Sequence, residues 1–228
     1  MSFGRVLPSS PLPISLQTSL STSISDIIQS PDSIENVKDS DLRPIYFRDI
    51  SLAISSSLTT YLLHNVLSHI VFDPKHYHLS TSELHVRWPK CNGIPPHQDS
   101  FYHALSPLNS FKLLIPLTTY NISSGGLFHA HVPHDQPTLV HTASDTPGFS
   151  SYIKSLKYSE FKWSSHDLRP FEIAWHSLGN IHYANPNTTT SPTIFVVCRY
   201  DHNDSIVDES LYSRYLSVLK KHQQITKQ

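Results

Sequence analysis

A histidine and an aspartate two residues apart, His97 and Asp99, follow a turn rich in glycine and proline that begins at Cys91. In an extended segment the side chains alternate between the two faces, so these two would share one face of a sheet. An imidazole nitrogen and a carboxylate oxygen are two of the three ligands of the facial triad that holds non-heme Fe(II). The pair therefore predicts a metal site that needs one more histidine from a distant part of the chain.

Histidine is common in this chain, with 16 residues, so an isolated H-x-D pair is weak evidence. A second pair, His202 and Asp204, lies in a polar stretch, and we do not interpret it as a site. For six other histidines, a surface, structural or cavity-lining role is the alternative to metal binding. They are His64 and His69 in a predicted helix, and His129, His131, His134 and His141, of which the first two would share a strand face.

The bulk composition excludes several classes of protein. With 228 residues the chain is long enough for one domain with a substantial core. A formal net charge of -1 gives no electrostatic reason to expect nucleic acid or an anionic membrane as a partner. No apolar run reaches the roughly 20 residues of a membrane span, and the N-terminus lacks the pattern of a secretory signal. Two distant cysteines, Cys91 and Cys198, imply no disulfide framework, so we expect a reducing, cytoplasmic location.

The order of segments predicts a mainly β fold with flanking helices. Residues 1–44 are rich in Ser and Pro and are predicted to be a loosely packed arm with at most a short helix near residues 24–29. Residues 45–228 are predicted to form a single domain, with many short strands separated by turn signals, as in a β-sandwich or barrel. Amphipathic helices are expected at 49–69 and 208–222. Strands are expected at 80–88, 111–117, 127–132, 137–141, 171–176 and 193–200, and 148–162 should be helical or irregular.

The third metal ligand is expected at His182, and the residues around it complete a resemblance to a known family. Three blocks in one order resemble the phytanoyl-CoA dioxygenase family over about residues 80–200: Val86-Arg87-Trp88-Pro89, Gly93 and His97-Gln98-Asp99; Gly125-Gly126-Leu127; and Trp175-His176, His182 and Pro186-Asn187. The resemblance implies a double-stranded β-helix core, which is jelly-roll or cupin-like, and an Fe(II)/2-oxoglutarate-dependent oxygenase. It implies that His97, Asp99 and His182 bind the iron, and that His176 belongs to the wall of the site.

The chain departs from that family where the co-substrate is anchored. Relatives usually carry an arginine on the strand after the distal histidine, and that arginine pairs with the far carboxylate of 2-oxoglutarate. The matching position here is about Thr193, which has no charge. Lys112, in an otherwise apolar strand, and Arg199, on the last strand, are the possible replacements. Lys112 is the preferred one, because a buried ammonium needs an anionic partner and because its placement is similar to the anchoring lysine of JmjC-related hydroxylases.

The function expected from this resemblance is oxidation, by default hydroxylation, of a small-molecule substrate with O2 and 2-oxoglutarate as co-substrates. Desaturation or ring closure would use the same ligands. Two alternatives remain open. The first is a 2-oxoglutarate-independent non-heme iron enzyme on the same fold, which the missing arginine favours. The second is a non-catalytic β-sandwich binding module whose histidines are structural.

Overall fold

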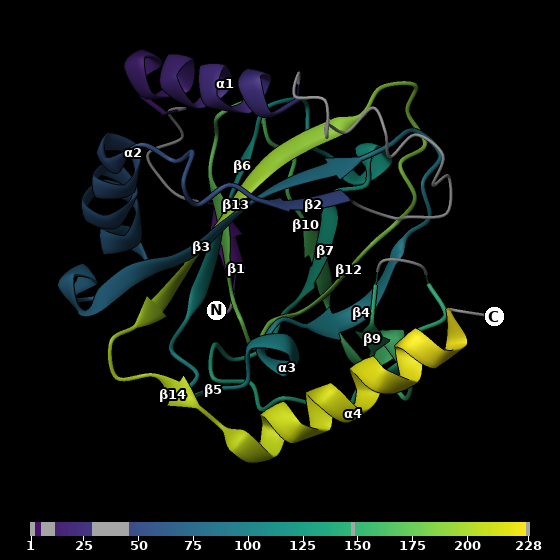
Figure 1. Cartoon of the computed structure of the whole chain (residues 1–228). Helices are drawn as coiled ribbons and strands as arrows, with labels where there is room; N and C mark the ends of the chain where they lie inside the picture. Colours follow the sequence, from purple (N-terminus) through teal and green to yellow (C-terminus); the bar gives the residue numbers. More distant parts are fainter. Residues whose placement is uncertain (1–2, 6–11, 29–45, 147–148, 227–228) are drawn as a thin grey trace.

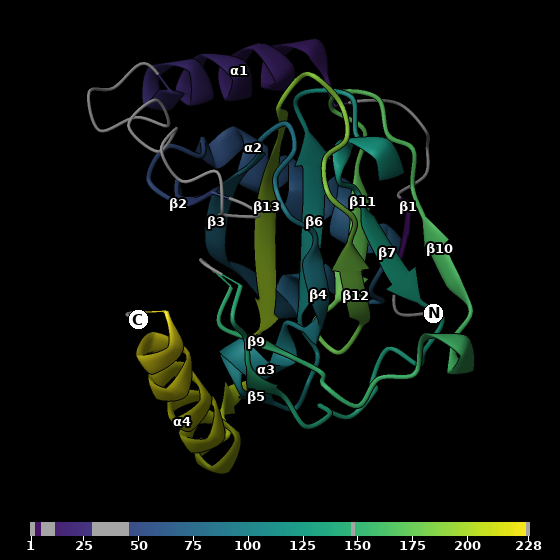
Figure 2. The same cartoon turned by 90° about the vertical axis from the view of Figure 1, so that its right-hand side faces the viewer.

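Two antiparallel sheets that face each other form the centre of the molecule (Figures 1 and 2). The structure is a computed structural model, and it describes residues 3–5, 12–28, 46–146 and 149–226. The larger sheet has the order β1-β11-β6-β13-β3-β2, with bounds Phe3–Arg5, Ala174–Ser177, Phe111–Pro116, Thr193–His202, Tyr77–Arg87 and Tyr46–Asp49. The smaller sheet has the order β10-β7-β12-β4, with bounds Trp163–Ser165, Leu127–Ala130, Ile181–Ala184 and Ile94–Gln98. Two small pairs complete the strands: β5 (Leu105–Ser106) with β14 (Ile206–Val207), and β8 (Thr142–Ala143) with β9 (Ser151–Tyr152). This arrangement confirms the predicted double-stranded β-helix.

The alternation of side chains along the strands separates the core into two layers. On β13, Val196 and Cys198 face a large apolar cluster on the outer side of the larger sheet. Phe195 and Val197, at the positions between them, face inward with Ala184 of the smaller sheet. Because both faces of β13 are buried, its sequence is a continuous apolar run rather than an alternating one.

Helices cover the outer face of the larger sheet. α1 (Ile14–Ile28) and α2 (Ser56–Tyr61) contribute buried leucines to the outer apolar cluster, and Figure 1 shows them together on one side of the molecule. The last helix, α4 (Glu209–Ile225), lies at the opposite end in both views, and Asp208 caps it by accepting a hydrogen bond from the Leu211 amide. The shorter helical turns are η2 (Leu62–Val66), η3 (Leu67–His69), η4 (Pro74–His76), α3 (Ser100–His103), η5 (Ile122–Ser124) and η6 (Tyr158–Glu160). Within the described ranges, no helix has the length and apolar character that crossing a membrane requires.

The beginning of the chain differs from the loosely packed arm that we predicted. β1 pairs with β11, placing Phe3 opposite His176, and α1 is a 15-residue helix rather than a short turn. Leu20 and Ile24 are each only 2% exposed, because they pack one helical turn apart into the outer cluster. Of the predicted helix near 24–29, the part up to Ile28 belongs to α1, and Gln29 lies outside the described residues.

Two other segments correct the sequence-based prediction, and a third, 149–162, agrees with it. The expected helix at 49–69 is α-helical only in α2 and continues as π and 3-10 turns to His69. The expected strand at 137–141 is absent, because the Gln98 side chain satisfies this backbone: its amide donates to the Pro137 carbonyl (3.1 Å) and accepts from the Leu139 amide (2.7 Å). Residues 149–162 are irregular, with the short β9 and η6.

Candidate metal site

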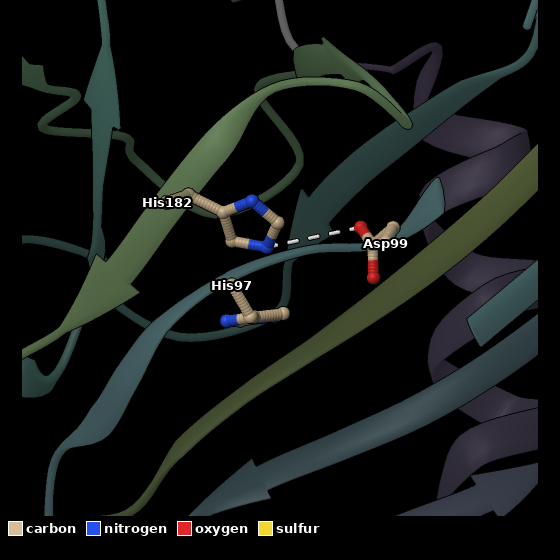
Figure 3. A group of neighbouring side chains, drawn as sticks. All are labelled: His97, Asp99 and His182. Atoms are coloured by element: carbon tan, nitrogen blue, oxygen red, sulfur yellow. Dashed lines mark ion pairs between the residues drawn. The ribbon is translucent and has the colours of Figure 1, made fainter. Parts of the chain in front are cut away.

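The two histidines and the aspartate predicted as ligands converge between the sheets. His97 lies on β4 and His182 on β12, where the strands pair and place the two residues opposite each other. Asp99 follows the end of β4 with helical backbone angles rather than in the extended conformation that we expected. One ligand atom from each residue lies within 4.8 Å of the other two, and Figure 3 shows the three side chains next to one another, with His182 pointing toward Asp99. The His182 Nε2 atom is 3.7 Å from Asp99 Oδ2.

Backbone carbonyls orient both imidazoles so that one ring nitrogen of each faces the site. The Nδ1 atom of His97 lies 3.0 Å from the Pro95 carbonyl oxygen, and that of His182 lies 3.0 Å from the Asn180 carbonyl oxygen. A carbonyl only accepts, so Nδ1 must carry the proton and Nε2 keeps a free lone pair. Metal-binding histidines commonly donate their other ring N–H to a backbone carbonyl in this way.

The charge states of the three residues suit a metal cation. Burial lowers the pKa of His97 to about 4 despite the nearby Asp99 carboxylate, and burial with the neighbouring His97 lowers the pKa of His182 well below its usual value. Both rings are therefore neutral near pH 7, as metal ligation requires. Burial alone would raise the pKa of Asp99, but the Lys112 charge and the His176 hydrogen bond outweigh it and hold that pKa well below its usual value.

Two further side chains form hydrogen bonds with the Asp99 carboxylate, one at each oxygen. The Lys112 ammonium donates to Oδ1 at 2.9 Å, and His176 Nε2 lies 3.0 Å from Oδ2. His176 thus belongs to the wall of the site as expected. His129 is also buried, bonds to the Asn180 side chain at 2.8 Å and stacks on Phe3, whereas the exposed His131 bonds to a serine hydroxyl.

A cavity of about 350 Å³ opens beside the three ligands, between the two sheets. Its walls combine aromatic and aliphatic side chains with a few polar ones, a composition typical of small-molecule sites. Residues from β3, β6 and β13 of the larger sheet form one wall. The apolar lining includes Tyr102, Leu127, Phe149, Phe195, Val197 and Tyr215, the last from α4.

The three proposed anchors for a co-substrate have different surroundings. Lys112 lines the cavity but is already paired with Asp99. Thr193 is 1% exposed and donates its hydroxyl to the Ser124 carbonyl, and Arg199 is bound by His103, Ser80 and Asp201. In the part of the chain that the structure describes, neither Thr193 nor Arg199 lines the cavity.

Three polar residues of the cavity wall on β3 were not predicted from the sequence to belong to the site: Glu83, His85 and Arg87. They alternate with Leu84 and Val86, which are buried in the outer apolar cluster. The period of two was visible in the sequence and placed all three on one face. A polar strand face usually contacts solvent, but here it faces the cavity between the sheets.

Similar solved structures share this architecture. The epimerase SnoN, crystallised with Fe3+, alpha ketoglutarate and nogalamycin RO, aligns with a TM-score of 0.67 at 13% identity over 90% of this chain and 81% of SnoN. EvdO2 from Micromonospora carbonacea var. aurantiaca, crystallised with 2-oxoglutarate, aligns with a TM-score of 0.66 at 15% identity over 87% and 85%. The non-heme monooxygenase ThoJ aligns with a TM-score of 0.65 at 15% identity over 99% and 94%.

This chain has the fold of those non-heme enzymes. By sequence, no protein-family model matches it, so the narrower resemblance to the phytanoyl-CoA dioxygenase family stays a prediction. No curated protein matches its sequence either.

Proposed function

We propose that this protein is a non-heme Fe(II)/2-oxoglutarate-dependent oxygenase that oxidises a small molecule with O2. The observation that carries the proposal is the convergence of one ring nitrogen from each of two imidazoles and one carboxylate oxygen within 4.8 Å, at the wall of a cavity of about 350 Å³. His97, Asp99 and His182 would hold the metal. Three protein ligands would leave the other coordination positions of the metal free for O2 and 2-oxoglutarate.

The residues around the ligands fit that role. Iron with 2-oxoglutarate supplies the activation of O2 for oxidation of the substrate. The carbonyls of Pro95 and Asn180 fix the two imidazoles, while Lys112 and His176 keep the Asp99 carboxylate ionised and in place. The apolar walls exclude water from the reacting positions.

Hydroxylation is the default outcome that we propose for the reaction. The solved neighbours include a carbocyclase and an epimerase, both described as alpha ketoglutarate dependent, so the fold also supports ring closure and epimerisation. The cavity wall carries Glu83 and His85 beside its aromatic residues, which indicates a substrate with both polar groups and apolar surface.

An iron enzyme that does not use 2-oxoglutarate is the second candidate. The uncharged, buried Thr193 favours it, because the larger sheet then lacks the arginine expected at that position. A binding module without a metal would leave the hydrogen-bonded orientation of both imidazoles without a purpose.

Turnover without a known substrate separates these candidates. Purified protein loaded anaerobically with Fe(II) is exposed to O2 and 2-oxoglutarate, and succinate formation is measured. We expect slow, iron-dependent succinate formation that Asp99→Ala abolishes and that the exposed His134→Ala control retains. Iron binding without succinate formation would support the second candidate.

We further propose that residues 45–228 form the catalytic domain, to which β1 and α1 are added as a structural part. We also propose a reducing, cytoplasmic location. Both cysteines, Cys91 and Cys198, are buried free thiols.

A further inference from the structure

Arg87 is buried in the wall of the cavity with most of its hydrogen-bonding capacity unused. The side chain is 1% exposed, and it lines the same cavity as the metal ligands. Nη2 donates to the carbonyls of Asn92 (3.0 Å) and Asn185 (2.8 Å). Nε and Nη1 are buried and have no hydrogen-bond partner among the described residues. A guanidinium has five N–H donors, so the larger part of this one is free.

The Arg87 guanidinium also lacks a counter-charge. In the described ranges no carboxylate forms an ion pair with it; the ionisable groups near it are the Cys91 thiol, which also forms a side-chain hydrogen bond with it, and the Tyr120 hydroxyl. A buried charge is strongly unfavourable unless it is paired and hydrogen-bonded. Asp99, by contrast, has its own cation in Lys112. The structure therefore presents a buried cation at the cavity wall that an anion would satisfy.

The position of Arg87 corresponds to that of the missing family arginine on the adjacent strand. β3 and β13 pair so that Arg87 lies directly opposite Thr193. The guanidinium reaches across to the smaller sheet, where Asn185 lies three residues after His182. At about 3.3 Å per residue of strand, the contact with Asn185 lies roughly 10 Å along the chain from the metal ligand His182.

A five-carbon dicarboxylate has the length to join these two positions. Its extended carbon chain spans about 5 Å, and a metal bond and a hydrogen bond at its two ends bring the reach to about 10 Å. Gly125 lies directly against the guanidinium: a Cβ there would come within 3.1 Å of Nε, and its φ of 83° also disfavours a side chain. Glycine at this position thus leaves room around the guanidinium.

We propose that Arg87 binds the distal carboxylate of 2-oxoglutarate and replaces the arginine that the chain lacks at position 193. The inference rests on the proposed function and assigns one binding residue within it. It also explains why neither Lys112 nor Arg199 is needed as the anchor: both have acidic partners of their own, Asp99 and Asp201.

Two ligands that differ only at the distal end test this assignment. 2-Oxopentanoate has the same chain length as 2-oxoglutarate but carries a methyl group in place of the distal carboxylate. Binding of each acid to the Fe(II)-loaded protein is measured anaerobically by isothermal titration calorimetry. In the wild type, 2-oxoglutarate should bind about ten- to a hundredfold more tightly than 2-oxopentanoate, the scale of a charged hydrogen bond.

Arg87→Gln should abolish that preference. Its affinity for 2-oxoglutarate should fall to that for 2-oxopentanoate, while 2-oxopentanoate and iron bind as in the wild type. Arg87→Lys, which keeps the charge and guards against misfolding of the first variant, should retain part of the preference. Arg214→Gln, the same substitution at an exposed position of α4, should retain all of it.

The outcomes distinguish the possible errors. If Arg87→Gln binds both acids more weakly by the same factor, the role of Arg87 is purely structural and the assignment is overturned. An unchanged preference in Arg87→Gln, together with its loss in Lys112→Met, would overturn it in favour of Lys112. If the iron-loaded wild type binds neither acid, the proposed function itself fails, and this inference fails with it.

Discussion

Replacing Lys112 with methionine removes the ammonium from a buried ion pair and keeps most of the side-chain volume. The Nζ–Oδ1 distance to Asp99 is 2.9 Å, and the two side chains are 11% and 8% exposed. At an effective dielectric constant of about 20, the direct attraction at this distance is roughly 6 kcal/mol. Removing one member of a buried pair typically costs about 3–5 kcal/mol. Because His176 still bonds to the other oxygen, we expect a loss near 3 kcal/mol.

This loss should be visible in thermal unfolding of the metal-free protein. For a chain of this size it corresponds to a decrease in Tm of roughly 6–12 °C. Lys157→Met is the matched control: Lys157 also forms an ion pair, with Glu160 at 3.3 Å, but these side chains are 75% and 59% exposed. An exposed pair contributes at most about 1 kcal/mol. Equal Tm values for the two variants would refute the buried charge pairing.

Addition of a divalent metal provides a second measurement on the same variant. A metal ion at the triad supplies the positive charge that Lys112→Met lacks beside Asp99. A saturating metal should therefore raise the Tm of this variant by more than it raises that of the wild type or of Lys157→Met. An equal or smaller increase would show that the metal does not bind next to Asp99.

Two further predictions concern stability. Phe3→Ala removes a 6%-exposed ring that stacks on His129 at a centroid distance of 5.0 Å, so it should lower the free energy of unfolding in urea by about 3 kcal/mol. The control Phe72→Ala, at a fully exposed position, should leave that free energy unchanged. Similar values for the two variants would mean that β1 does not pack as described. Burial lowers the pKa of His141 to about 4, and its Nε2 accepts a hydrogen bond from the Gln98 backbone N–H at 3.1 Å, so the ring is neutral in the folded protein. The unfolded chain takes up this proton below about pH 6.5, so stability is complete above that pH and falls between pH 6.5 and about 4. His141→Gln should lose roughly 3 kcal/mol less over this range than the wild type, and parallel curves would contradict this.

The grouping of the three candidate metal ligands was predictable because its main signal is local. His97 and Asp99 are two residues apart, and the order of the three sequence blocks then selected His182. The strands with strong apolar character, such as 111–117 and 193–200, were predicted within one or two residues of β6 and β13. Their hydrophobic runs are long because both faces of the larger sheet are buried.

What was missed depends on long-range contacts that a local pattern does not carry. The Ser/Pro-rich start of the chain gave no sign that Phe3 pairs with β11 and stacks on His129. His182 lay in none of the predicted strands, but its short strand exists because β4 and β7 pair with it on both sides. Arg87 belonged to the residues that carry the family resemblance, but no role was assigned to it. Only the packing of the two sheets against each other shows that its side chain lines the cavity.

The iron content of purified protein tests the central claim most directly. After anaerobic reconstitution with Fe(II) and removal of excess metal, we predict one iron per chain in the wild type and in the exposed control His134→Ala. Asp99→Ala and His182→Ala, if folded by circular dichroism, should each hold well under a tenth of that amount. Full retention of iron in both ligand variants would contradict the assignment of His97, Asp99 and His182 as the metal site.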